Sequence, residues 1–168
     1  MLPIPDEFLI KHQVYLEVRL QQAMNEQMLR EGRPLMHITV VEDVSGLGLQ
    51  HLNMQGMMKF KKVVRVGADY FPEILCRVLV VRAPWIFSQI WGIVQHFFDE
   101  GTRAKIQIVS SRDTYKVMNQ HIESKWIPKD LGGNMCVGSS ALCEPFLPAG
   151  GAVPQKLLDD IVKSCQHA

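Results

Sequence analysis

The chain has 168 residues, 47% of them hydrophobic, which is enough to bury a core of its own as one domain over residues 1–168. Its 18 lysines and arginines nearly balance its 17 aspartates and glutamates, which leaves a net charge of +1. This balance excludes nucleic acid as an expected partner, because proteins that bind it concentrate basic residues on one face. It also excludes a strongly basic surface as the main attraction to a membrane.

The cysteines and the apolar runs predict a cytoplasmic protein with free thiols. The cysteines are Cys76, Cys136, Cys143 and Cys165. No two of them form a C-x-x-C pair, and residues 1–6 carry no secretory signal. The best candidate for a membrane span, residues 74–81, is interrupted by Arg77 and is far shorter than the roughly 18 residues that a span requires. Any membrane contact is therefore expected to be peripheral.

Hydrophobic periodicity predicts two helices and one strand in the first part of the chain. An amphipathic helix is expected over residues 7–30, with Asp6 as its N-cap and a Gly-Arg-Pro sequence after it. Residues 37–44 (HITVVEDV) read as a short buried strand, followed by a glycine turn. A methionine-rich helix is expected over residues 49–66, with Gly67 as its cap.

The same alternation continues to the end of the chain. Strands are predicted over residues 74–82 and 105–110, and helices over residues 85–98, 113–122 and 154–166. Glycines and prolines make residues 126–134 irregular and residues 137–152 loop-rich. Helices that alternate with strands are typical of an α/β fold, in which a mainly parallel β-sheet is flanked by helices.

Residues 84–98 (PWIFSQIWGIVQHFF) form the most unusual segment. Its apolar side chains cover nearly the whole circumference of the predicted helix. Such a helix is either buried on all sides, which periodicity alone favours, or it faces a lipid or a bilayer in addition to its own core. Trp85 and Trp91 suit an interface, because the indole ring is both apolar and polar. The nine methionines would suit a lipid tail, but also a soft core.

Motifs for catalysis and for metal binding are missing from the sequence. Gly46 and Gly48 lack the third glycine of a dinucleotide site, because His51 stands in its place. There is no phosphate-binding loop and no G-x-S-x-G nucleophile elbow, and the six histidines lack zinc-site spacing. We therefore expect no catalytic residue, no metal ion, no cofactor and no enzymatic activity.

Two charged residues stand at the starts of predicted strands. Glu73 precedes the strand at residues 74–82, and Lys105 opens the strand at residues 105–110. If the helix between these strands is a crossover between parallel neighbours, both residues lie at one edge of the sheet. They are then either ordinary solvated charges or a clamp for a polar headgroup beside an apolar cavity.

Three motifs follow one another between residues 36 and 134. They are ITVVEDVSGLGL, YFPEILCRVLVVRAPWIF and IPKDLGG, and between the last two stand Trp91, Phe97-Phe98, Thr102 and Lys105-Ile106. In this order and spacing they resemble the CRAL-TRIO family, the lipid-binding domain of phosphatidylinositol transfer proteins and of tocopherol and retinaldehyde carriers. Members usually carry a small helical module and a first strand upstream, of which this chain shows only the helix at residues 7–30.

The resemblance implies an apolar pocket under a gate helix, which corresponds to residues 85–98. The gate helix and pocket lining would be formed by Trp85, Phe87, Ile90, Trp91, Val94, Phe97 and Phe98. In members that bind phosphatidylinositol, a glutamate, a threonine and a lysine surround the inositol phosphate, and they match Glu73, Thr102 and Lys105.

Other family positions differ in this chain. The upstream basic residue that helps to bind phosphate is missing. The serine and threonine that contact phosphatidylcholine in some members fall near Ile38 and Val40, which cannot donate hydrogen bonds. This difference makes exchange of phosphatidylinositol for phosphatidylcholine less expected than binding of phosphatidylinositol or another lipid.

The expected function is to bind a single lipid, phosphatidylinositol or a related phospholipid, and to transfer or present it between membranes. Its partners would be the lipid and, transiently, a membrane surface. A carrier of a tocopherol or retinoid remains an alternative, as does an interaction module with a vestigial pocket and a protein partner in a signalling protein. A small α/β enzyme is the third alternative, and the absence of catalytic motifs argues against it.

Overall fold

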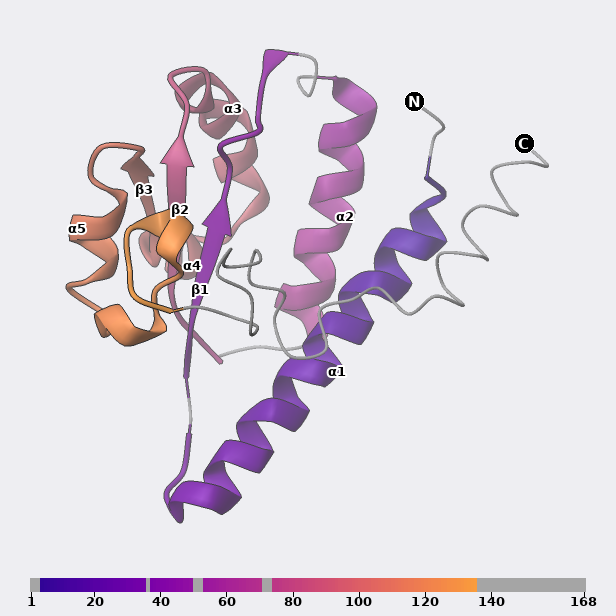
Figure 1. The fold of residues 1–168 in the computed structure, drawn as a ribbon. Coiled ribbons are helices and arrows are strands. Elements are labelled where there is room, and N and C mark those ends of the chain that lie inside the picture. Colours follow the sequence, from indigo (N-terminus) through magenta and orange to yellow (C-terminus); the bar gives the residue numbers. More distant parts are fainter. Residues whose placement is uncertain (1–3, 36, 50–52, 71–73, 136–168) are drawn as a thin grey trace. The chain divides into compact units, whose positions relative to one another are not determined.

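The computed structural model describes residues 4–35, 37–49, 53–70 and 74–135 (Figure 1). The elements, in chain order, are α1 (Asp6–Glu31), β1 (Ile38–Asp43), α2 (Met54–Tyr70), β2 (Leu75–Ala83), α3 (Phe87–Val94), η2 (Gln95–Phe97), α4 (Glu100–Ala104), β3 (Ile106–Ser110), α5 (Thr114–Met118), η3 (Ser124–Trp126) and η4 (Lys129–Leu131). They fall into two compact units, the helical pair α1 and α2 and a sheet unit that contains the rest. The predicted terminal helix and the loop-rich segment before it lie outside the described residues.

In the helical pair, Asp6 links the two helices. Its carboxylate pairs with Lys62 and, at 3.4 Å, with Lys59, both on α2. The hydrogen bond from Lys62 holds the pKa of Asp6 below its usual value. The sequence predicted Asp6 as the N-cap of α1, but that place belongs to Pro5, which makes no capping bond through its side chain. At the other end, Gly32 closes the helix in the left-handed region, at φ 63°.

The ends of three other helices differ from the prediction. Helix α2 begins five residues later than expected and continues through Gly67, with an ion pair of 3.6 Å between Arg65 and Asp69 in its last turns. Helix α3 covers only part of residues 85–98, because the chain tightens into η2 and Asp99 then caps the separate helix α4. Helix α5 is confined to Thr114–Met118.

The sheet unit is built on three parallel strands in the order β1-β2-β3. Val78 of the central strand lies beside Val40 on one side and beside Ile106 on the other. Strands that are consecutive in the chain are thus neighbours in the sheet, as short crossovers favour. The arrangement confirms the predicted α/β fold with a parallel sheet flanked by helices.

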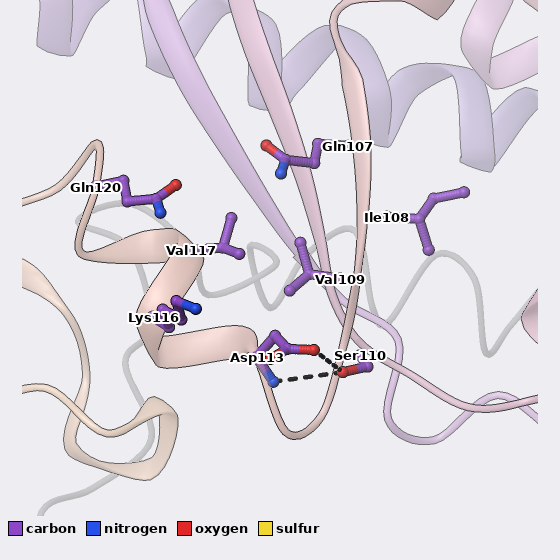
Figure 2. Close-up of a pocket in the computed structure, with 8 residues that line it drawn as sticks. All are labelled: Gln107, Ile108, Val109, Ser110, Asp113, Lys116, Val117 and Gln120. Atoms are coloured by element: carbon purple, nitrogen blue, oxygen red, sulfur yellow. Dashed lines mark hydrogen bonds between the residues drawn. The ribbon is translucent and has the colours of Figure 1, made fainter.

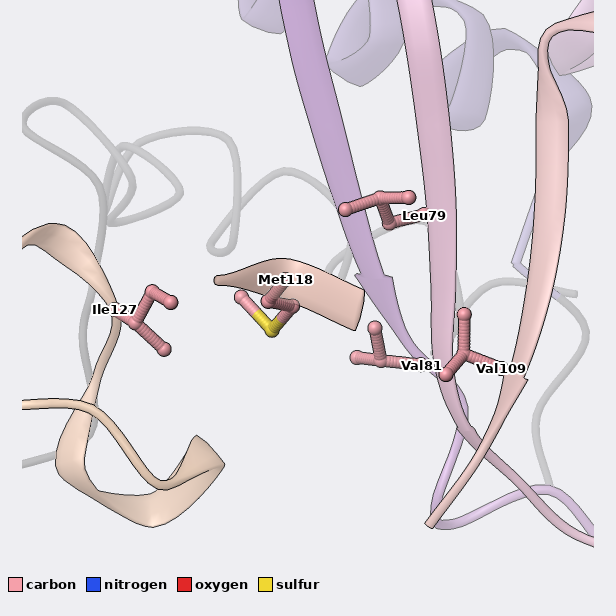
Figure 3. Close-up of a cluster of buried hydrophobic side chains, with 5 residues drawn as sticks. All are labelled: Leu79, Val81, Val109, Met118 and Ile127. Carbon is pink, nitrogen blue, oxygen red and sulfur yellow. The ribbon is translucent and has the colours of Figure 1, made fainter. Parts of the chain in front are cut away.

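One face of this sheet is filled by a compact core. Figure 3 shows its five buried side chains, which come from β2, β3, α5 and the segment before η4: Leu79, Val81, Val109, Met118 and Ile127. The turn at Gly133 closes over this core, since a Cβ atom there would lie 2.1 Å from the carbonyl oxygen of Ile127. Only glycine fits that contact, and the preceding Gly132 lies in the left-handed region at φ 92°.

Arg82 joins four segments at the carboxyl edge of the sheet. Its guanidinium pairs with Asp43 at the end of β1 and, at 3.5 Å, with Asp130 of η4. Its backbone N–H donates to the hydroxyl of Thr114, which is only 3% exposed, at 3.2 Å. Arg82 is also held at φ 51°, a left-handed conformation that costs about 1 kcal/mol or more in a residue other than glycine. Because Pro84 and α3 follow directly, these contacts fix the point where α3 leaves the sheet.

We predict that Asp43→Asn lowers the free energy of unfolding by about 1 kcal/mol at neutral pH, because a charge-assisted hydrogen bond to Arg82 is lost. The hydrogen bond from Arg82 lowers the pKa of Asp43 from 3.8 to about 2. A depressed pKa contributes stability above the unfolded value, and this contribution is lost as the pH falls from near 3.8 toward 2. The difference between wild type and variant should therefore shrink over that window in denaturant titrations.

Asp69→Asn is the matched control, because its pairing with Arg65 on α2 is solvent-exposed. It should change the free energy of unfolding by no more than about 0.5 kcal/mol. Equal losses in the two variants would contradict a special role for the junction at Arg82.

Candidate functional site

Helix α3 carries an apolar cluster of its own. Its buried members are Ile86, Ile90 and Val94, and the partly buried side chains against them are Leu47, Trp91 and Phe97. None of these belongs to the core between the sheet and α5. Figure 1 shows α3 and α5 on opposite sides of the sheet. The helix is therefore packed on an apolar surface separate from the sheet core.

Three aromatic rings form a stack along this helix. The rings of Phe87 and Trp91 lie 6.4 Å apart between centroids and are nearly parallel, at 16°. Trp91 continues to Phe98 at 6.1 Å and 32°. Phe87 and Trp91 are one helical turn apart, so the helix itself sets their spacing. The first pair is thus stacked and the second is tilted, and both pairs add to the apolar packing around Trp91.

Two apolar side chains of the same region point to solvent instead. Trp85, just before the helix, is 77% exposed, and Ile93 is 48% exposed. The structure thus brings together most of the predicted pocket residues around Trp91, but places Trp85 on the outside.

The sheet face opposite the α5 core is also apolar. The strand register aligns Val40, Val78 and Ile106 in one row and Glu42, Val80 and Ile108 in the next. Val80 is buried, whereas Ile108 is 39% exposed. Glu42 is the acidic residue in these two rows. Glu42 was not among the predicted site residues, although the alternation of β1 already places it on the face of Val40.

Thr102 is engaged within α4. Asp99 accepts hydrogen bonds from the backbone N–H of Thr102 at 2.9 Å and from its hydroxyl at 2.6 Å. The hydroxyl bond is the main reason why the pKa of Asp99 is lowered. Because the hydroxyl hydrogen is used in this way, the oxygen of Thr102 is left with lone pairs to accept from a ligand.

Lys105 stands at the start of β3 with an exposed side chain. Its carbonyl oxygen accepts a hydrogen bond from the N–H of Val78 at 2.9 Å, which anchors the residue to β2. Within the described part of the chain, its ammonium group forms no ion pair. Lys105 can therefore meet an anionic ligand without breaking an existing pair.

Glu73, the third predicted headgroup residue, lies outside the described residues. Strand β2 begins at Leu75 and pairs with β3 from Val78 onward. Three residues of strand span about 10 Å. The start of β2 therefore lies about 10 Å along the strand from the point where Val78 bonds to Lys105.

A hollow of about 360 Å³ lies elsewhere, between β3 and α5. It differs from the predicted lipid pocket in position and in lining, since Gln107, Ser110, Asp113, Lys116 and Gln120 make it polar.

Neither a metal site nor a membrane span is found within the described ranges. No group of three or more histidine, cysteine or acidic side chains there could hold a metal ion. None of the helices there combines the length and the apolarity needed to cross a bilayer. Cys76 is a free cysteine on β2, and it is exposed.

Comparison with known proteins gives a consistent result. A family profile described as the CRAL/TRIO domain matches residues 5–133, so the match begins earlier than the motifs at residues 36–134 and includes α1. A crystal structure of Sfh5 is similar to the chain with 26% sequence identity and a TM-score of 0.45, over 51% of this chain and 30% of that one.

Two relatives illustrate the similarity in sequence. The CRAL-TRIO domain-containing protein T23G5.2 of Caenorhabditis elegans is 34% identical over 140 residues, which cover 82% of this chain and 18% of that protein. Protein real-time of Drosophila melanogaster is 30% identical over 138 residues, which cover 81% of this chain and 20% of that protein. The chain thus spans about a fifth of the length of these relatives. It belongs to the CRAL-TRIO family, whose members bind lipids or other small hydrophobic molecules.

Proposed function

We propose that this chain binds a single lipid, phosphatidylinositol or a related phospholipid, and transfers or presents it between membranes without catalysing a reaction. The observation that carries the proposal is that two apolar surfaces of the sheet unit lie outside its core. The α3 cluster shares no residue with the core under α5, and the sheet face with Val78 and Ile108 belongs to neither cluster. A hydrocarbon chain is a suitable partner for such surfaces, because it needs no hydrogen bonds.

The energy available from a lipid tail is large enough for stable binding. Each buried methylene contributes about 0.8 kcal/mol, so ten of them contribute about 8 kcal/mol. This corresponds to a dissociation constant of roughly 1 μM before the costs of ordering are subtracted. A second acyl chain offsets those costs, which favours a two-chain lipid over a single fatty acid.

The polar end of the ligand would meet Lys105 and Thr102. Lys105 offers an ammonium group for a phosphate. Since the hydroxyl of Thr102 already donates to Asp99, its remaining role is to accept a hydrogen bond from a sugar hydroxyl. Glu73 would accept from other hydroxyls of the same ring. A phosphorylated polyol satisfies all three groups, which supports phosphatidylinositol as the ligand.

The exposed side chains before and within α3 support a contact with membranes. Trp85, before the start of α3, and Ile93, near its end, present apolar surface to solvent. Tryptophan favours the boundary between headgroups and acyl chains. We infer that these side chains touch the bilayer when lipid is loaded or released, and that the contact is peripheral.

The proposal predicts that the purified protein carries about one lipid per chain. Solvent extraction of natively purified protein followed by mass spectrometry should identify it, and labelled phosphatidylinositol should move between donor and acceptor vesicles. Recovery of a tocopherol or retinoid instead would reassign the ligand within the family. If no lipid is recovered and none is transferred, the carrier function is wrong, and a protein-docking role is favoured.

A second prediction concerns the headgroup. Lys105→Ala should weaken phosphatidylinositol binding about tenfold or more, because one charge-assisted hydrogen bond is lost, and adding Glu73→Ala should abolish it. Uptake of an uncharged fluorescent lipid should change little. Arg112→Ala removes an exposed cation beyond β3 and is the matched control. Unchanged phosphatidylinositol binding in the double variant, with an intact circular dichroism spectrum, would remove these residues from the site.

A third prediction separates membrane contact from lipid binding. Trp85→Ala should lower vesicle association and the transfer rate severalfold, because an interfacial indole is lost, while the bound lipid is retained. Trp126→Ala is the control, since that ring is also exposed but lies in η3. The measurements are vesicle co-sedimentation and lipid content. Equal effects of the two substitutions would contradict a specific membrane contact at α3.

A further inference from the structure

Strand β3 is an edge of the described sheet, and its outward backbone groups can be identified. The N–H of Val78 donates to the carbonyl oxygen of Lys105, and Val78 lies beside Ile106. In a parallel ladder, alternate residues of an edge strand bond to its neighbour, so Lys105, Gln107 and Val109 face β2. The N–H and C=O groups of Ile108 therefore point away from the sheet, where no described residue pairs with them.

This edge lacks the usual protection against strand pairing. Edge strands in soluble proteins are normally guarded by charged side chains, prolines or bulges. The sequence of β3, IQIVS, contains no charge, no proline and no glycine, and the side chain of Ile108 is 39% exposed. The one register shift of the β2–β3 pair lies between Val80 and Ala83 on β2, not on β3. A strand of this composition favours the addition of another strand.

The hollow beside the edge is polar at both ends. Figure 2 shows Gln107 and Gln120 together at one end, and Asp113 with Ser110 at the other. The hydroxyl of Ser110 donates to the carboxylate of Asp113 at 2.8 Å. Lys116 lies between the two ends. The two glutamine amides and the ammonium of Lys116 form no hydrogen bond or ion pair within the part of the chain that the structure describes.

We propose that two copies of this chain associate through β3, as antiparallel strands related by a two-fold axis at Ile108. In this arrangement the two Ile108 residues exchange both N–H···O bonds, which is the pattern of a hydrogen-bonded pair. The two-fold axis also places the hollows of the two copies side by side in opposite directions. The glutamine amides of one copy then face the Asp113 carboxylate of the other. Because of the symmetry, this pairing of N–H donors with an acceptor occurs twice in the dimer.

A second copy fits this edge better than an unrelated peptide, because the hollow contains both halves of a complementary pair. It has donors without partners at one end, a carboxylate at the other and a cation in between. A two-fold axis matches each end to its complement without any further group. An isolated acidic or basic peptide would satisfy only one end.

Sedimentation equilibrium of the whole chain over a concentration series tests the proposal. The wild type should form dimers. Gln120→Glu, which places a carboxylate opposite Asp113 of the other copy, should raise the dimer dissociation constant about tenfold at low salt. Gln120→Lys, at the same exposed position, should leave it unchanged or lower it. A wild type that stays monomeric at all concentrations, or identical constants for the two variants, would overturn the proposal.

Ile108→Pro tests the backbone pairing directly. Proline removes only the outward N–H, so the bonds to β2 remain and the variant should be a folded monomer. Thr39→Lys, an exposed position on β1, is the control and should still form dimers. If the Thr39 variant is monomeric and the Ile108 variant dimeric, the wrong edge has been assigned. If Ile108→Pro does not fold, the dissociation constants of the two Gln120 variants still test the dimer.

Discussion

The pairing of β2 between two parallel neighbours is the constraint on which the rest of the sheet unit depends. Side chains alternate along a strand, so β2 directs Leu79 and Val81 to one face and Val78 and Val80 to the other. The first face is closed by Met118 and Ile127. The second face also carries apolar side chains of β2 and β3, together with Glu42 of β1, and it does not enter that core. One strand thus builds a rigid support and an apolar surface at the same time.

The junction at Arg82 connects this support to the candidate site. An arginine in the left-handed region is retained because Asp43, Asp130 and Thr114 hold its side chain and its N–H. The chain then enters α3 from a fixed point, while the helix beyond packs on its own cluster. If α3 is the gate over a lipid, this separate packing would let it shift without disturbing the core.

The sequence was sufficient to predict those parts of the fold that depend on local patterns. Alternating apolar runs located the three strands, and ordered motifs identified the family. Helix ends were less accurate. Asp6 is used by the lysines of α2 rather than as a cap. The helix predicted over residues 85–98 already ends at Val94, where the chain tightens into η2. The role of Arg82 could not be predicted at all, since its partners come from three segments far apart in the chain.

The sheet uses different groups for the two activities proposed for it. Lipid binding would involve side chains on the face of Val78 and Val80, whereas association would involve backbone groups that lie in the plane of the sheet at β3. Ile108 belongs to both sets, but through its side chain in one case and through its N–H and C=O in the other. Because side chains stand perpendicular to the plane in which strands pair, an occupied face does not block a paired edge. A dimer formed through β3 would therefore keep α3 of each copy free to meet a membrane.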